Sequence, residues 1–229
     1  VPSFTFVATA NSVKAVGAKP VFVDILRENY TMDPDDLRKK ITKRTKAIIP
    51  VHLYGHVAYM EEIIELAKKN NLKIIEDASQ SLGSKFKGKH SGTFSHLGCF
   101  SFYGAKVTTS GEGGAIVTDD KNLCEKLKQI RNHGQSKNNL ITRLGLNLRL
   151  SEINAAIAKI QMKKLSLFLM QRKRNAKILT ELLQNCDVIL PKQRKNETFN
   201  WYLYTIAHKN RNKIMKKLNS LGIGATVYY

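Results

Sequence analysis

The feature that most constrains the fold of this chain is the alternation of short apolar runs with helix-patterned segments over residues 1–131. The runs are rich in β-branched and aliphatic residues, and the segments between them repeat apolar side chains every three or four positions. Such alternation predicts an α/β, doubly wound, mainly parallel sheet with helices on both faces. The expected strands are 20–25, 45–51, 72–75, 97–102 and 114–118, with a hairpin at 85–92, and the expected helices are 7–16, 34–41, 59–70 and 122–131.

The pattern changes after Leu150, where one long helical region begins with Ser151 as its expected N-cap. A break is expected near 165–167. Beyond the helices the sequence predicts strands at 188–190 and 201–207, a helix at 211–221, and a segment 225–229 that stops in mid-strand. We therefore divide the chain into a large domain (1–150), connecting helices (151–185) and a partial small α/β domain (186–229).

Four polar side chains come at or just past the carboxyl ends of predicted strands: His52, Asp77, Ser101 and Lys106. Each alone has a commoner structural role, as a helix cap, a backbone hydrogen-bonding group or a solvated cation. Together they lie at the edge where open parallel sheets bind ligands. The glycines of the loop Gly111–Gly114 also allow close backbone approach. This arrangement favours a functional site.

These residue types suit one chemistry in particular. A lysine amine that forms an imine must be neutral part of the time, which burial and neighbouring charges arrange. A carboxylate such as Asp77, facing a heteroaromatic nitrogen, keeps that nitrogen protonated and makes the ring an electron sink. A hydroxyl such as that of Ser101 suits a phosphate. The set therefore predicts a pyridoxal 5'-phosphate (PLP) site, with Lys106 as the imine-forming amine.

Other classes of site fit less well. The loop Gly111–Gly114 matches neither the dinucleotide fingerprint nor the phosphate-loop motif. No metal is expected, because no His, Cys or carboxylate cluster has ligand spacing. The apolar runs are far shorter than the roughly 20 residues of a membrane span, and the chain opens without a secretory signal. With three unpaired cysteines, we expect a cytoplasmic protein with reduced thiols.

The net charge of +20 raises a nucleic-acid-binding hypothesis. Residues 1–126 hold 18 basic and 14 acidic side chains, whereas residues 127–229 hold 20 and 4, so the excess is concentrated in the second part. Most of these cations fall on the polar faces of long predicted helices. The chain also lacks the common nucleic-acid-binding motifs. We expect a solvated basic surface, and keep a basic nucleic-acid-binding regulatory protein as an alternative.

Six motifs resemble, in order, those of the DegT/StrS (DegT/DnrJ/EryC/StrS) sugar aminotransferases, which are fold type I PLP enzymes. They run through essentially the whole chain: Pro-Ser-Phe-Thr-Phe-Val-Ala-Thr at 2–9, Val-His-Leu-Tyr-Gly at 51–55, Glu-Asp-Ala-Ser-Gln at 76–80, the stretch 100–114, Arg-Asn-His-Gly at 131–134, and Gly-Leu-Asn-Leu-Arg-Leu-Ser-Glu at 145–152. The resemblance implies the fold type I architecture and transfer of an amino group to a nucleotide-linked keto-sugar. The donor would be an amino acid, glutamate in the family, and the product would enter cell-surface polysaccharide or deoxyamino-sugar biosynthesis.

The resemblance also implies roles for particular residues. Lys106 matches the lysine that forms the internal aldimine with PLP and then shuttles the proton. Asp77 matches the carboxylate that pairs with the pyridine nitrogen. Some relatives carry His in place of the lysine and become sugar dehydratases, so Lys106 argues against that branch.

Four further positions match cofactor ligands of the family. Gln80 corresponds to the side chain near the ring hydroxyl, Phe6 to the aromatic residue that stacks on the ring, and Ser101 to a phosphate ligand. Asn147 corresponds to a residue that reaches the phosphate of the neighbouring subunit's cofactor, which implies a homodimer with shared active sites. Without the resemblance, Phe6 reads as a core aromatic residue and Asn147 as a turn residue.

The sequence departs from the family at both ends. Members of the family are longer and carry, before the region that matches here, a Gly-Thr-x-Ala-Leu helix start whose amides bind the cofactor phosphate. We therefore expect a chain truncated at both ends, with weakened cofactor binding. A truncated inactive paralogue with a structural role is the corresponding alternative.

Overall fold

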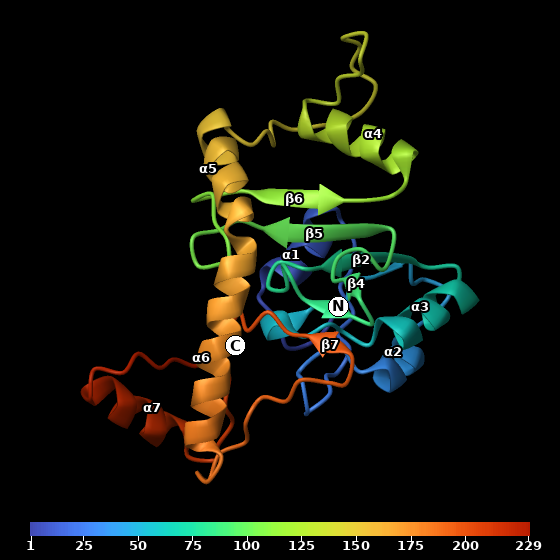
Figure 1. Ribbon diagram of the computed structural model, residues 1–229. Coiled ribbons are helices and arrows are strands. Elements are labelled where there is room, and N and C mark those ends of the chain that lie inside the picture. The colour runs from blue at the N-terminus through green and yellow to red at the C-terminus, as the bar shows by residue number, and fades with distance from the viewer.

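A four-stranded sheet lies at the centre of the computed structural model, which describes residues 1–229 (Figure 1). Its strand order is β1 (Ala47–Ile48), β2 (Lys73–Asp77), β5 (Leu97–Ser101) and β6 (Gly114–Val117). β2 runs parallel to both β1 and β5, and β6 is antiparallel to β5. The sheet is mainly parallel, as predicted, with one antiparallel edge strand.

The four helices predicted in the first part are confirmed: α1 (Ala8–Ala15), α2 (Pro34–Lys40), α3 (Met60–Lys69) and α4 (Lys121–Arg131). α2 begins as its sequence predicts, because Asp33 accepts a hydrogen bond from the Asp35 amide at 2.8 Å and Pro34 takes the first helical position. α4 begins in the same way, with Asp120 accepting from two amides of its first turn. Local sequence therefore fixes these helix starts.

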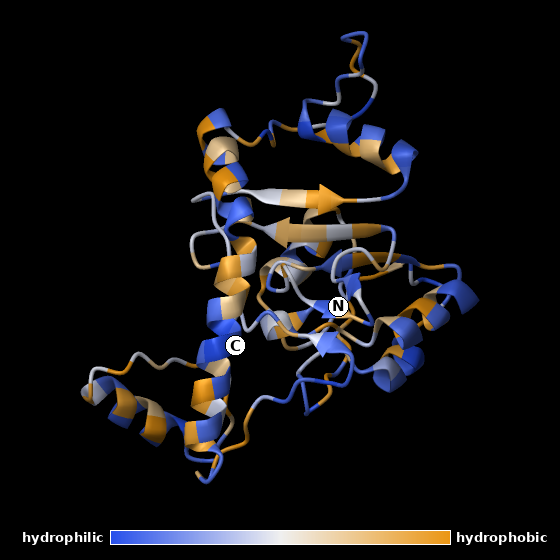
Figure 2. Cartoon of the chain, viewed as in Figure 1, coloured by the Kyte–Doolittle hydropathy of each residue, from blue (hydrophilic) through white to orange (hydrophobic).

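The main core lies between α3, α2 and the strands β1 and β2. α3 buries one apolar stripe, and polar residues alternate with it along the helix (Figure 2). The core cluster consists of Val23, Met32, Leu37, Ile48, Val57, Ala58, Met60, Ile63, Leu66, Ala67, Leu72 and Ile74. This packing anchors β2 and so fixes the position of its last residue, Asp77.

Two consecutive helices, α5 (Glu152–Lys163) and α6 (Leu165–Leu183), form a long rod along one side of the sheet (Figure 1). Ser151 caps α5 by accepting a hydrogen bond from the Asn154 amide at 3.2 Å, as predicted. The predicted break is also present, with Lys164 between the two helices.

The predicted hairpin at 85–92 forms β3 (Lys85–Phe86) and β4 (Lys89–His90). A strand that the sequence did not predict, β7 (Glu197–Thr198), adds to β3 and makes a second, three-stranded sheet. Nearby, the buried Asn200 donates hydrogen bonds to the carbonyls of Gln80 and Leu82 at 2.9 and 3.0 Å. This part of the predicted small domain thus packs closely on the large one, and the division into three domains stays a prediction.

Four predicted strands are wrong. Segment 188–190 makes only a single bridge, between Ile189 and Ala207. Segment 20–25 pairs only through single bridges, Val23 with Pro2 and Ile25 with Met32, because its two ends face different neighbours. Segment 201–207 starts with a turn, in which the Asn200 side chain accepts the Tyr202 amide, and it makes one bridge from Ala207.

Segment 225–229 is not a strand either, since its Ala225 amide bonds to the Asn219 side chain rather than to a neighbouring strand. The predicted strand at 45–51 is shortened to β1 and a bridge at Val51. The helix predicted at 211–221 is confirmed as α7 (Arg211–Ser220).

Candidate active site

Asp77 ends the central strand β2, with β1 on one side and β5 on the other. Its Oδ2 atom accepts a hydrogen bond from the Thr9 hydroxyl at 2.8 Å, and its Oδ1 atom accepts from the Ser79 amide at 3.2 Å. Both hydrogen bonds fix the orientation of the carboxylate at the carboxyl edge of the sheet.

Lys106 lies in the turn after β5, where its amide donates to the Tyr103 carbonyl at 3.0 Å. Partial burial lowers the pKa of the Lys106 amine, while the negative charge of Asp77 acts in the opposite direction. The Lys106 Nζ atom also lies 5.0 Å from the centre of the Tyr202 ring, a cation–π distance. The structure therefore brings Lys106 and Asp77 within electrostatic reach of each other, as the sequence predicts.

Gln80 is buried, and both ends of its amide are engaged. Its Oε1 atom accepts the Tyr54 amide at 2.8 Å, which turns the amide nitrogen toward the site. Nε2 then donates to the phenol oxygen of Tyr229 at 2.8 Å. Gln80 is thus oriented to donate a hydrogen bond to the hydroxyl of an aromatic ring.

Phe6 lies beside the same phenol, with its ring centre 6.3 Å from that of Tyr229. Its side chain is 57% exposed, so the interpretation as a core aromatic residue is wrong. Burial raises the pKa of Tyr229, and the charge of Asp77 raises it further, so this phenol also senses the carboxylate. A hydroxylated ring is therefore accommodated among Phe6, Gln80 and Asp77.

PLP is itself a hydroxylated aromatic ring, and the residues present fit it. The phenol of Tyr229 stands in for the ring hydroxyl at Gln80, and it would have to leave Gln80 when such a ring binds. The exposed face of Phe6 is free for stacking, and Asp77 supplies the anionic partner that a protonated ring nitrogen needs.

Ser101 is the last residue of β5, next to the glycine-containing loop. Its Oγ atom accepts the Tyr103 amide at 3.3 Å, which leaves the hydroxyl hydrogen free to donate to an anion. The loop folds back at Gly113, whose φ of +150° favours glycine and whose added Cβ would lie 2.8 Å from the Ser110 Oγ. The backbone here needs glycine for close approach.

Asn147 lies apart from the other five predicted residues. It belongs to the arm formed by residues 132–150, which projects from the body of the chain between α4 and α5 (Figure 1). Its backbone makes an isolated bridge with Asn132, and its side chain is exposed. Within one chain, Asn147 does not join the site.

His52 does not serve as a ligand-facing group. It is fully buried, and its Nδ1 atom accepts the Ala58 amide at 3.0 Å while Nε2 lies 2.9 Å from Glu76 Oε2. Because Nδ1 accepts, Nε2 carries the hydrogen and donates it to Glu76. His52 is a structural residue beneath the site.

Sequence reasoning missed Thr9, Tyr54 and Tyr202 as neighbours of the site. Thr9 stands in the first quoted motif, three positions after Phe6, but nothing local indicates that its hydroxyl reaches residue 77. Tyr202 follows the predicted helices and reaches Lys106 only through tertiary packing. Spacing alone offers no signal for such contacts.

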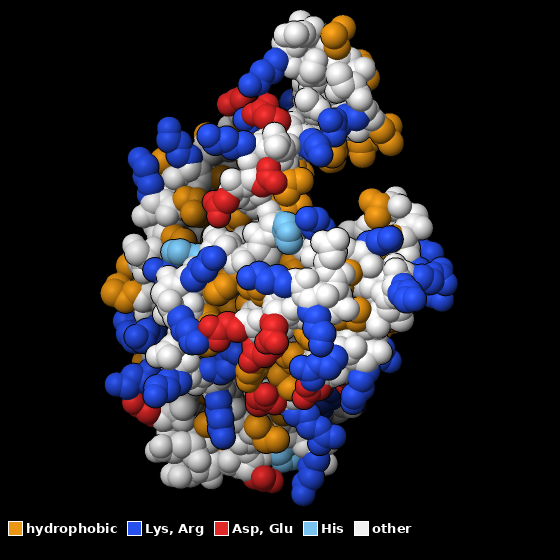
Figure 3. All heavy atoms as spheres, turned by 90° about the vertical axis from the view of Figure 1, so that its right-hand side faces the viewer, with side chains coloured by type: hydrophobic (Ala, Val, Ile, Leu, Met, Phe, Trp, Pro, Cys, Tyr) orange, Lys and Arg blue, Asp and Glu red, His pale blue; other side chains and the backbone are white.

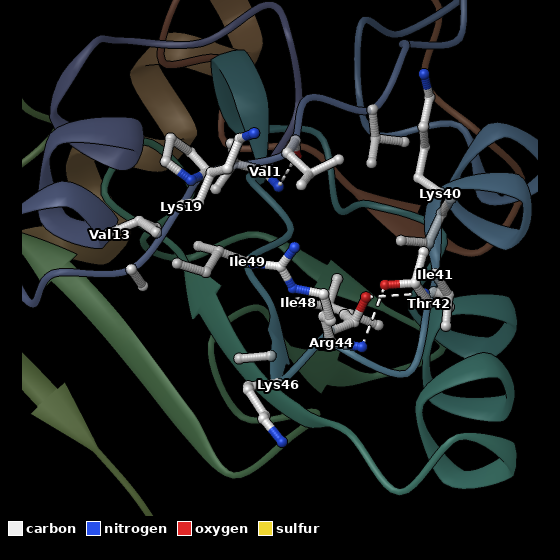
Figure 4. A pocket seen from close by; sticks show the side chains of 17 residues that line it. Val1, Val13, Lys19, Lys40, Ile41, Thr42, Arg44, Lys46, Ile48 and Ile49 are labelled. Atoms are coloured by element: carbon white, nitrogen blue, oxygen red, sulfur yellow. Dashed lines mark hydrogen bonds between the residues drawn. The ribbon is translucent and has the colours of Figure 1, made fainter.

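A separate cavity of about 550 Å³ lies beside β1 and contains none of the six predicted residues. It is mostly apolar, lined by Val1, Val13, Leu37 and residues between Ala18 and Val23 and between Lys40 and Ile49. The side chains of Lys40 and Lys46 point away from its centre (Figure 4). Without polar groups that converge on a ligand, it is a poor candidate for catalysis.

The chain also matches a known family. The model of the DegT/DnrJ/EryC1/StrS aminotransferase family matches residues 1–229. The chain belongs to this family. Members of the DegT/DnrJ/EryC1/StrS family that it resembles include a "pleiotropic regulatory protein" of Geobacillus stearothermophilus, which is 40% identical over 231 residues, 99% of this chain and 62% of that protein.

A second relative is a UDP-N-acetyl-3-dehydro-α-D-glucosamine 3-aminotransferase of Acidithiobacillus ferrooxidans, 40% identical over 230 residues, which are 100% of this chain and 62% of that enzyme. Among solved structures, that of S. venezuelae DesV in complex with a ketimine intermediate has a TM-score of 0.97 at 36% identity, and covers 100% of this chain and 62% of DesV. The predicted family and PLP-transferase fold are confirmed. The chain spans about 62% of the length of these relatives.

Two further properties concern metal binding and membrane insertion. No group of three or more His, Cys, Asp or Glu side chains is arranged to hold a metal ion. None of the helices has both the length and the apolar character needed to cross a membrane.

Proposed function

We propose that this chain carries the catalytic centre of a PLP-dependent aminotransferase that converts a nucleotide-linked keto-sugar into an amino-sugar. The observation that carries the proposal is the convergence of Lys106, Asp77 and Gln80 on a site that already accommodates a hydroxylated ring. Membership in a family of aminotransferases supports it independently.

PLP, when bound, supplies an electron sink and carries the amino group from donor to acceptor. The chain's own residues bind and orient it. Asp77, a carboxylate fixed by two hydrogen bonds, would pair with the ring nitrogen, and Gln80, oriented by the Tyr54 amide, would donate to the ring hydroxyl. Phe6 would cover one face of the ring, and the Ser101 hydroxyl would donate to the phosphate.

Lys106 provides the reactive amine and moves the proton at its Nζ atom. Burial lowers the pKa of this amine, which favours the neutral form that attacks a carbonyl. The charge of Asp77 and the ring of Tyr202 favour the protonated form instead. Because burial favours the neutral amine and the neighbouring groups favour the protonated one, Lys106 can both accept and return a proton.

The substrate class rests on the relatives. One is named a UDP-sugar 3-aminotransferase, and others are named GDP-perosamine synthases and a dTDP-3-amino-3,4,6-trideoxy-α-D-glucose transaminase. We therefore propose a nucleotide-linked keto-sugar as acceptor and an amino acid, glutamate as in the family, as donor. The product would serve polysaccharide or deoxyamino-sugar biosynthesis.

A homodimer with shared sites is part of the proposal. The arm at residues 132–150 exposes apolar side chains, with Leu144 90% exposed, and Ile153 at the start of α5 is 75% exposed. Apolar surface of this extent is typical of an interface. Asn147 on the same arm would then reach the partner's cofactor phosphate.

The cofactor test is direct. Added PLP should give an absorption band at about 410–430 nm that depends on the Lys106 amine and is lost in Lys106→Ala. Lys121→Ala, at an exposed lysine that starts α4, is the matched control and should keep the band. If saturating PLP gives no band with the unchanged chain, the proposal fails for this chain.

The dimer needs its own measurement. Light scattering should show a dimer for the unchanged chain and a monomer for the double substitution Leu144→Asp with Ile153→Asp. Leu221→Asp, at a residue 61% exposed near the end of α7, should leave the dimer intact. A monomeric unchanged chain would contradict the shared site, and would favour the alternative of an inactive paralogue.

The nucleic-acid-binding alternative has less support. Lys and Arg side chains spread over the visible face and are interspersed with acidic ones rather than gathered in one patch (Figure 3). If DNA shifted in a gel at about 150 mM salt and lost the shift at higher salt, the alternative would regain support.

A further inference from the structure

A hydroxyl chain leads from the N-terminal segment to Asp77. Thr9 is 5% exposed, and its Oγ1 atom lies 2.8 Å from Asp77 Oδ2. The Thr5 Oγ1 atom lies 3.2 Å from Thr9 Oγ1. Since a carboxylate only accepts, Thr9 donates to Asp77, and Thr5 must then donate to Thr9. The two hydroxyls therefore point their hydrogens toward Asp77 in sequence.

This contact is well placed to control the carboxylate. The other oxygen of Asp77 has only the longer 3.2 Å bond from the Ser79 amide, so Thr9 makes the shorter hydrogen bond. A buried hydroxyl that donates to a carboxylate favours its ionised form and restricts its rotation. The same short segment contains Phe6, so one stretch of chain would hold both the stacking ring and the orientation of Asp77.

We propose that Thr9, supported by Thr5, is a positioning residue that holds the Asp77 carboxylate aimed at the nitrogen of the bound ring. The inference rests on the proposed function for the identity of that ring. The hydrogen bond itself is present in the chain without cofactor, and so can be tested separately.

Other ionisable groups also act on Asp77 and must be kept constant. Lys106 faces it from the turn after β5, Cys99 from β5 and Tyr229 from the C-terminal segment, and Glu76 is its neighbour in β2. Substitutions at Thr9 leave all four unchanged. A difference between Thr9 variants therefore reports the hydroxyl.

The first experiment records the Asp77 carboxyl signal by carbon-13 NMR at about pH 7 without cofactor, with Asp77→Asn to assign it. Thr9→Val keeps the shape and removes the hydroxyl, and should shift this signal because the carboxylate loses its shorter hydrogen bond. Thr9→Ser keeps the hydroxyl and should stay near the unchanged chain. Thr180→Val, which removes a helix hydroxyl far along α6, should have no effect.

The second experiment adds PLP labelled with nitrogen-15 in the ring. Thr9→Val should shift the ring-nitrogen signal toward the unprotonated form and weaken PLP binding about tenfold, and Thr9→Ser should restore both. Equal Asp77 carboxyl signals in all Thr9 variants would overturn the inference. Failure of the unchanged chain to bind PLP, with the Asp77 shift still present, would instead overturn the proposed function.

Discussion

His52 and Glu76 form a fully buried pair in which the Nε2 and Oε2 atoms lie 2.9 Å apart, and Glu76 precedes Asp77 in β2. The Glu76 carboxylate also accepts hydrogen bonds from the Gly92 amide at 2.7 Å, and from the amide and hydroxyl of Ser95 at 2.8 and 2.9 Å. One side chain therefore ties β2 to the chain before α3 and to the loop before β5. Changing a buried carboxylate that accepts hydrogen bonds from every neighbouring group should lower the free energy of unfolding, because the donors lose their partner.

Glu76→Gln should destabilise the chain by about 3 kcal/mol, because the new amide nitrogen faces hydrogen-bond donors and leaves them unpaired. The free energy of unfolding would be measured by urea denaturation. Glu62→Gln, an exposed glutamate on the neighbouring α3, is the matched control and should change stability by less than about 0.5 kcal/mol. Equal stability of the two variants would show that the network contributes little.

Acid should weaken the fold through the same carboxylate. Burial alone would raise the pKa of Glu76, but hydrogen bonds from His52, Ser95 and Gly92 hold it below the ordinary value of 4.5. A lowered folded-state pKa stabilises the fold above pH 4.5, and that contribution is lost as the pH falls through the folded-state pKa. Glu197, bonded to His56, has a lowered pKa for similar reasons.

The pH dependence of unfolding tests this directly. Below pH 4.5, and down to the onset of acid unfolding, the free energy of unfolding of the unchanged chain should decrease as the pH is lowered. Each of Glu76→Gln and Glu197→Gln should reduce that slope, by at most about 1.4 kcal/mol per pH unit for one proton. Glu62→Gln should keep the original slope. A slope unchanged in all three variants would assign the acid sensitivity to other groups.

Gly55 is a point where the backbone admits no side chain. Its φ is +110°, and an added Cβ would lie 2.7 Å from Phe199 Cε2 and clash with the Asn200 side chain. Gly55→Ala should therefore cost several kcal/mol in thermal unfolding, from strain and from displacement of the segment that packs on it. Gly17→Ala, at a φ of +74° with open space around it, separates the two effects and should cost about 1 kcal/mol.

The difference between what could and could not be predicted follows from the range of the interactions. Asp33 and Ser151 cap their helices through bonds to residues two or three positions away, so the sequence predicts those starts. β7 forms only because Glu197 and Thr198 meet β3 more than a hundred positions earlier, which no local pattern encodes. The segment 20–25 has strand-like composition, but no single neighbouring strand pairs with it along its length. Its two bridges go to different segments, so the predicted strand does not form.

The candidate site divides in the same way. Lys106, Asp77 and Gln80 stand in local motifs, and the structure brings them together around the site that the Tyr229 ring occupies. His52 has an equally suitable position in the sequence, yet both of its ring nitrogens form hydrogen bonds within the protein, with Glu76 and with the Ala58 amide. Only the structure reveals this. Asn147 cannot be tested within one chain, because its expected role lies on a partner.

The cysteines should differ in reactivity. Burial raises the pKa of the Cys99 thiol to about 11, and the charges of Asp77 and Glu76 contribute to the shift. Cys186 is exposed, and no disulfide forms. Because the thiolate is the nucleophile, Cys99 should react with iodoacetamide at pH 8 roughly a hundredfold more slowly than Cys186. Mass spectrometry of timed digests would give both rates. In Asp77→Asn, removal of one charge should speed the labelling of Cys99, whereas an unchanged rate would assign its protection to burial alone.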